Sequence, residues 1–124
     1  DDVANDTIRK TLLTQVAPPG IKANVVDVEK AIRAYKNPKY EGVKVMLLFT
    51  NPTSVLRMVD GGVQIASVNI GGMSFKEGKT QLTQAVSVDD QDRKAFQALH
   101  EKGIELEIRK VNTDTKIDLM SILK

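Results

Sequence analysis

Residues 43–53 read Val-Lys-Val-Met-Leu-Leu-Phe-Thr-Asn-Pro-Thr, an almost unbroken apolar run followed by a polar turn. Such a run predicts a strand over residues 43–49 that is buried on both faces between helices. Asn51 followed by Pro52 is a typical helix start, because the Asn side chain caps free N–H groups and Pro suits the first helical position. A glycine pair at 61–62 ends the predicted helix. This stretch therefore predicts a layered α/β fold.

Segments with helical and strand patterns alternate along the rest of the chain. Predicted strands cover residues 21–28, 43–49, 63–70, 82–88 and 104–109, and predicted helices cover residues 5–16, 27–37, 51–60, 87–102 and 117–123. The longest helix is expected to start at Ser87, with Asp90 completing a capping box, and to stop at Gly103. The alternation predicts one doubly wound domain over residues 1–124, with an open, mostly parallel sheet, helices on both faces and room for an antiparallel last strand.

The apolar stripes and runs also predict which side chains are buried. The core is expected to contain Val45, Leu47, Val63, Ile65, Phe96 and Leu99.

Composition excludes several classes of function. The 124 residues contain no cysteine, which rules out disulfides, a Cys-based zinc site and a Cys nucleophile and makes a cytosolic location the default. A net charge of +2, spread evenly, and 4% aromatic residues do not predict nucleic-acid binding. The longest apolar run is far shorter than the roughly 20 residues of a membrane helix.

Ligands of open parallel sheets bind outside the carboxyl ends of the strands. The loops expected at that edge cover residues 1–2, 50–53 and 69–74. Residues 50–53 offer hydroxyls and an amide at a helix start, where a phosphate could bind, although simple capping is the commoner use of such residues. Gly71 and Gly72 allow positive φ and close approach to a ligand, but a turn explains them equally well.

His100 is the single histidine and falls on the predicted late helix. No Asp, Glu or Ser spacing around it indicates a catalytic triad or a metal site, so a solvated or structural His100 is expected. An acidic pocket of the receiver-domain type, built from Asp1, Asp2 and Thr50, lacks both the phospho-accepting Asp and the Lys that it would need.

Six ordered blocks of the sequence, from Asp1 to the C-terminus, resemble the IIB domain of mannose-, fructose- and sorbose-type phosphotransferase systems. They are residues 9–13 (RKTLL), 15–18 (QVAP), 37–40 (NPKY), 48–53 (LFTNPT), 69–73 (NIGGM) and 103–106 (GIEL). The resemblance implies that a IIA protein phosphorylates a histidine on IIB, and that IIB passes the phosphate to a sugar entering through the membrane partners IIC and IID. It implies a cytoplasmic protein, peripheral to the transporter, without cofactor or metal, and leaves a homodimer open.

The family's carrier histidine lies in an Asp-Asp-Arg-Leu-Ile-His-Gly-Gln loop after the first strand, and this sequence has no such stretch. His100 does not match it. The resemblance therefore implies a fragment without the first strand, the carrier loop, the first helix and most of the second strand; a strand donated by a second copy is the alternative. The residues carried over as the edge of the phosphate pocket are Asp2, Thr50, Asn51, Thr53, Gly71, Gly72, Ser74 and Phe75.

Two other functions remain open. A binding or regulatory module could keep the pocket but transfer nothing, and a generic flavodoxin-like ligand domain would explain the alternation but not the six blocks. Incubation with phosphorylated IIA separates a carrier from a module, because only a carrier becomes labelled on histidine.

Overall fold

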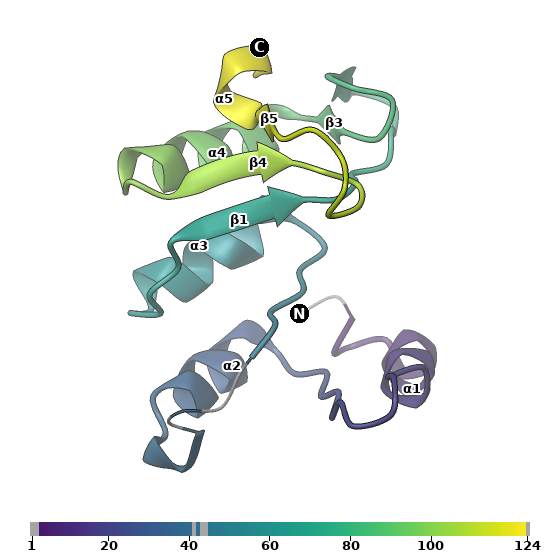
Figure 1. Ribbon diagram of the computed structural model, residues 1–124, viewed down its shortest axis with the longest axis vertical. Coiled ribbons are helices and arrows are strands. Elements are labelled where there is room, and N and C mark those ends of the chain that lie inside the picture. The colour runs from purple at the N-terminus through teal and green to yellow at the C-terminus, as the bar shows by residue number, and fades with distance from the viewer. Residues whose placement is uncertain (1–2, 41, 43–44, 124) are drawn as a thin grey trace.

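The structure is a computed structural model that describes residues 3–40, 42 and 45–123. The predicted strict alternation is not observed among the described residues: three α-helices and a 3-10 helix precede the first strand, and helices and strands are interspersed only after it (Figure 1). In order, the elements are α1 Thr7–Gln15, α2 Val28–Tyr35, a 3-10 helix Pro38–Tyr40, α3 Pro52–Asp60, β1 Ser67–Ile70, β2 Thr80–Gln81, β3 Ser87–Val88, α4 Asp90–Glu101, β4 Glu105–Ile108, β5 Ile117–Asp118 and α5 Leu119–Ile122.

Among the described residues, the main sheet has three strands in the order β1-β4-β5. β1 and β4 are parallel, with Ser67 opposite Glu105 and Ile70 opposite Ile108. β5 is antiparallel to β4. β2 and β3 form a separate antiparallel pair. The last predicted strand, residues 104–109, is therefore parallel to its neighbour β1, and the antiparallel strand β5 comes from residues 117–118, which were predicted as the start of a helix.

The helix boundaries follow local capping chemistry. The side chain of Asp27 accepts a hydrogen bond from the backbone N–H of Lys30 at 2.7 Å, and that of Asn51 accepts one from Ser54 at 2.8 Å. Gly103, with φ of +81°, ends the turn after α4 in a conformation that favours glycine. The predicted starts of α2 and α3 and the predicted stop of α4 are confirmed.

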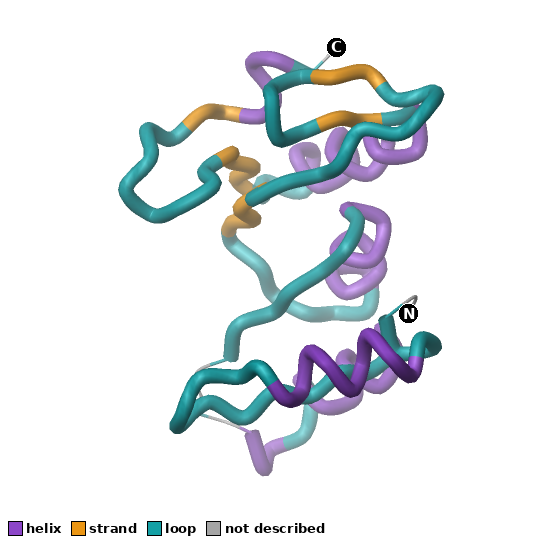
Figure 2. Tube along the Cα trace, turned by 90° about the vertical axis from the view of Figure 1, so that its right-hand side faces the viewer, coloured by secondary structure: helices purple, strands orange, loops and turns teal. Residues whose placement is uncertain are grey.

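The core lies between the sheet and two helices, α3 and α4, which pack side by side over one face (Figures 1 and 2). Phe96, Leu99 and Val63 are buried as predicted, and Ile65 is half-buried between two apolar clusters. The larger cluster consists of Val55, Ile70, Val86, Val88, Phe96, Leu99, Ile104, Leu106, Ile108 and Leu119. The smaller one consists of Val28, Met58 and Val63.

Within the strand predicted over residues 43–49, the described residues 45–49 form no strand. Residues 43 and 44 lie outside the described residues, and residues 45–49 pair with no described strand. Val45 is 66% exposed and Leu47 is 40% exposed, so the prediction that both are buried is wrong. A buried strand needs neighbours that bond its N–H and C=O groups and cover its faces. The apolar sequence alone cannot supply those neighbours.

Other predicted elements are shorter or displaced. Residues 21–27 form no strand, and only the second half of the run 63–70 does. The run 82–88 contributes only β3, which is preceded by a turn. The helix expected from Ser87 begins two residues later, with Asp89 as N-cap and Asp92 completing the capping box. Ser87 instead donates its N–H to Met73 at 2.9 Å, so β pairing holds it outside the helix.

α1 carries the predicted apolar stripe but buries none of its residues. Asp6, one of the two predicted caps, accepts the N–H of Arg9 at 3.1 Å. Ile8 is 73% exposed and Val16 is 70% exposed. Capping and side-chain spacing therefore explain why the helix forms, while its apolar face contacts little of the described chain.

Candidate functional site

The carboxyl ends of β1 and β4 form one edge of the sheet. Ile70 and Ile108 end these strands opposite each other, so the loops that start at Gly71 and Arg109 are neighbours. The Asn69 side chain joins them: its Nδ2 donates to the carbonyl oxygen of Arg109 at 3.0 Å, and the N–H of Arg109 donates to its Oδ1 at 3.0 Å. These two bonds hold both loops at the edge where ligands of parallel sheets bind.

The loop before α3 reaches the same edge. The chain returns from α3 through a short turn into β1, so the helix starts near the end at which β1 stops (Figure 1). Asn51 caps the helix, and its Nδ2 donates to Oγ1 of Thr50 at 3.3 Å. Capping, the commoner interpretation, is therefore correct for Asn51. Thr50 is exposed and Thr53 is half-buried.

The loop after β1 is held by backbone bonds rather than by unusual glycine conformations. Met73 donates its N–H to Ala85 at 2.7 Å. Gly71 and Gly72 do not have positive φ, and a Cβ at Gly72 would come no closer than 3.6 Å to the carbonyl oxygen of Ala85. Positive φ is thus not the reason for the pair. Ser74 is exposed, and Phe75 is 63% exposed.

A pocket of about 410 Å³ opens between the ends of β1 and β4, and we call it the strand-end pocket. Gly71 lines it, together with six polar residues: Thr83, Gln84, Arg109, Lys110, Asp114 and Thr115. The predicted site residues at 50–53 do not line it, and neither do Gly72, Ser74 and Phe75. The loops before α3 and after β1 were predicted from the sequence, but the loop after β4 was not, although it also follows the carboxyl end of a parallel strand.

Ion pairs and local hydrogen bonds shape the loop after β4. Arg109 donates from Nη2 to both carboxylate oxygens of Glu107, at 2.7 and 2.8 Å. Asp114 accepts from the backbone N–H groups of Lys110 and Val111 at 3.1 and 3.2 Å. These bonds order the loop and place the side chains of Arg109 and Lys110 on the wall of the pocket.

His100 lies away from this edge. It is exposed in the last turn of α4, and only a short turn separates α4 from the start of β4. Because β4 is parallel to β1, the start of β4 is the end of the sheet opposite Gly71 (Figure 1).

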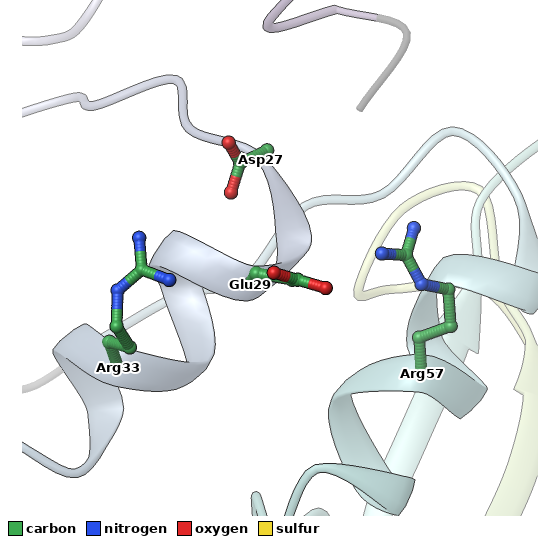
Figure 3. A pocket seen from close by; sticks show the side chains of 4 residues that line it. All are labelled: Asp27, Glu29, Arg33 and Arg57. Carbon is green, nitrogen blue, oxygen red and sulfur yellow. The ribbon is translucent and has the colours of Figure 1, made fainter.

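A second, smaller hollow of about 260 Å³ lies between α2 and α3. Figure 3 shows Glu29 extending from α2 toward α3 and Arg57 extending from α3 toward α2, while Asp27 lies at the start of α2 and Arg33 lies further along the helix. Two acidic and two basic residues line it, so their formal charges cancel.

Two further features concern the described part of the chain only. It contains no cluster of His, Cys, Asp and Glu side chains suited to a metal ion. None of its helices is long and apolar enough to cross a membrane. Asp2, the remaining predicted site residue, lies outside the described residues.

Comparison with known proteins places this α/β architecture in a family. The family model described as "PTS system sorbose subfamily IIB component" matches residues 1–124. The sorbose-specific EIIB component of Lacticaseibacillus casei is 53% identical over 120 residues, which are 97% of this chain and 73% of that protein. The chain therefore belongs to the sorbose-type family of phosphotransferase-system IIB components.

Solved structures carry the same fold. The crystal structure of the IIBSor domain of the sorbose permease from Klebsiella pneumoniae superposes with a TM-score of 0.97 at 52% identity, covering 99% of this chain and 76% of that one. The agreement confirms the predicted α/β fold class, a mostly parallel sheet with helices.

Some relatives are much longer than this chain. The mannose-specific EIIAB component of Escherichia coli K12 is 64% identical over 123 residues, but the chain spans only 38% of the length of that relative.

Proposed function

We propose that this chain is the IIB part of a cytoplasmic sugar phosphotransferase, which accepts a phosphoryl group on a histidine from a IIA protein. It then passes the group to a sugar entering through the membrane components IIC and IID. The observation that carries the proposal is the family match over residues 1–124, together with relatives named as sugar-specific IIB components. The name EIIAB of one relative supports a IIA partner.

In this proposal the carrier histidine belongs to a part of the protein outside residues 1–124. The position of His100, at the end of the sheet opposite Gly71, supports a carrier other than His100. The pocket edge around the carrier consists of Asp2, Thr50, Asn51, Thr53, Gly71, Gly72, Ser74 and Phe75. Hydroxyls and backbone N–H groups at the start of α3 suit this role, because phosphoryl transfer depends on donors that disperse the phosphate charge.

A second part of the proposal concerns residues 45–48, whose apolar side chains are exposed. The segment 45–48 is extended and unpaired within the described residues, and Met46 and Leu48 are 82% and 86% exposed. Leaving its polar groups and apolar side chains uncovered is unfavourable. We propose that a strand from the rest of the protein pairs with this segment and makes residues 1–124 part of one larger IIB domain. About a quarter of the IIBSor structure lies outside the match, enough for such elements.

Phosphoryl transfer tests the first part. The complete protein is incubated with IIA that carries a radiolabelled phosphohistidine, and the label on IIB is mapped by mass spectrometry. Acid-labile label on a histidine outside residues 1–124 is expected. Label on His100 would contradict the assignment, and complete absence of label would favour the alternative, a non-catalytic binding or regulatory module.

Hydrogen exchange tests the covering strand. In the complete protein, the amides of residues 45–49 should exchange slowly, as in a central strand, whereas an exposed segment exchanges within seconds. Fast exchange at residues 45–49, with slow exchange retained in β1 and β4, would refute the covering strand without affecting the phosphotransfer proposal.

A further inference from the structure

The strand-end pocket contains hydrogen-bond donors that the protein does not use. Among the described residues, the Lys110 ammonium, the Gln84 amide and the Thr115 hydroxyl make no hydrogen bond or ion pair. The Arg109 guanidinium bonds Glu107 through Nη2 only, which leaves Nη1 and Nε without an acceptor. Two cationic side chains with free donors therefore converge on one opening.

The cationic side of the pocket suits a phosphate group. Arg109 and Lys110 are consecutive, and the backbone of each is restrained, the first by Asn69 and the second by Asp114. Restraint of the backbone lowers the conformational entropy that the loop would lose on binding an anion. Charged donors form the stronger hydrogen bonds with phosphate oxygens.

The rest of the pocket suits the remainder of a small polar molecule. Ile108, Ile117 and Ala85 form an apolar wall, against which the C–H face of a ring can pack. Asp114 uses Oδ2 for two backbone N–H groups, so its other oxygen is free to accept a bond from a hydroxyl. The volume of about 410 Å³ falls within the range of small-molecule sites, about 300 to 1,000 Å³.

We propose that the strand-end pocket binds a small phosphate monoester that carries several hydroxyl groups, such as a hexose monophosphate. Lys110 and Arg109 hold the phosphate, while Gln84, Thr115 and Asp114 bond the hydroxyls. The carboxyl ends of two parallel strands are the usual position of such a site. This binding is reversible and involves no transfer, and it stands on the pocket's own residues rather than on the proposed phosphotransfer.

Nuclear magnetic resonance titration of the complete protein tests the proposal. Hexose 6-phosphate should shift the backbone amides of residues 71, 83–85 and 109–115 in a saturable manner. Inorganic phosphate should shift the same amides at least tenfold more weakly, and the free hexose should shift none of them. Equal binding of phosphate and ester would refute recognition of the hydroxyls. Equal binding of the free hexose would refute recognition of the phosphate.

Side-chain variants locate the site. Lys110→Gln should weaken hexose 6-phosphate binding about tenfold, and Gln84→Ala should also weaken it by removing a hydrogen-bond partner of the hydroxyls. Lys94→Gln, which removes an exposed charge from α4, is the matched control and should leave binding unchanged. Unshifted spectra on addition of the ester, or equal weakening by Lys94→Gln, would overturn the proposal. Spectra of the unliganded variants that match wild type outside the pocket show that the fold is retained.

Discussion

The side chain of Asn69 forms hydrogen bonds with both the N–H and the C=O of Arg109, a residue that lies 40 positions later in the sequence. A single amide therefore bridges the carboxyl ends of two parallel strands. These hydrogen bonds connect the end of β1, where the next loop starts, with Arg109, which lines the strand-end pocket.

Asn69→Ala should lower the free energy of unfolding by about 1 to 2 kcal/mol, because two hydrogen bonds at about 1 kcal/mol each are lost. The amides of Arg109 and Lys110 should also exchange faster with solvent. Chemical denaturation and hydrogen exchange of the complete protein measure the two effects. Asn112→Ala, at an exposed turn position, is the control and should change neither. Unchanged exchange at Arg109 in Asn69→Ala would show that the strand ends are held by other contacts.

The side chain of Asp92, on α4, forms an ion pair with Lys79, which lies directly before β2. Its Oδ2 lies 3.2 Å from Nζ of Lys79 and accepts the N–H of Asp89, and the side chains of Asp92 and Lys79 are only 8% and 17% exposed. Asp92→Ala should therefore destabilise the protein by about 1 to 3 kcal/mol, since it leaves a half-buried ammonium and a backbone N–H unpaired. The unfolding free energy in urea is the measurement.

Asp90→Ala serves as the comparison for Asp92→Ala. Asp90 also pairs with a basic residue, Arg93, but its side chain is 91% exposed, so its loss should cost less than about 0.5 kcal/mol. Equal destabilisation by the two substitutions would show that burial does not determine the strength of these pairs.

The N-cap Asp89 makes stability dependent on pH. The backbone N–H of Asp92, which donates to the Asp89 carboxylate, holds the pKa of this group below its ordinary value of 3.8. A lowered folded-state pKa means that the carboxylate stabilises the fold above pH 3.8 and that this contribution is lost as the pH falls from 3.8 through the folded-state pKa.

Asp89→Asn keeps the cap but removes the titration. The melting temperatures of wild type and variant should therefore be close near neutral pH. Below pH 3.8, wild type should lose stability faster than the variant. Thermal unfolding followed by circular dichroism at a series of pH values measures the difference. A difference in melting temperature that stays constant through this range would contradict the assignment.

His100→Gln should leave phosphate acceptance by the complete protein unchanged, because the residue lies at the end of the sheet opposite Gly71. Its exposed position predicts a stability change of less than about 0.5 kcal/mol. Phosphoryl transfer from labelled IIA and urea denaturation are the measurements. Loss of acceptance in a variant that unfolds like wild type would mean that His100 takes part in the transfer.

Local sequence was sufficient wherever the determining interaction is local. Asp27, Asn51 with Pro52, and Gly103 were predicted as helix boundaries and are observed there, because caps and glycine stops act within a few residues. The displaced start of α4 shows the limit. Ser87 has the right chemistry for a cap, but a backbone bond to Met73 draws it into β pairing, which no local pattern reveals.

The candidate site was predictable only in part. The strand-end rule led to the loops at Thr50 and Gly71, but the pocket beside them is completed by Thr83 and by Arg109 and Lys110. These residues meet because β4 pairs with β1 in one register and Met73 pairs with Val86. The strand register cannot be read from the spacing of residues in the sequence, because two paired strands can lie at any distance along the chain.

The sequence by itself determined the helix boundaries at Asp27, Asn51 and Gly103, the burial of the α4 stripe and the family. Tertiary structure alone decided which apolar runs are covered. Phe96 lies on the apolar stripe of a largely charged helix and is 2% exposed, whereas Val45 lies in an almost unbroken apolar run and is 66% exposed. The reason is physical: a helix satisfies its own backbone bonds and needs only one covered face, whereas a central strand is buried only when other strands pair with it on both sides.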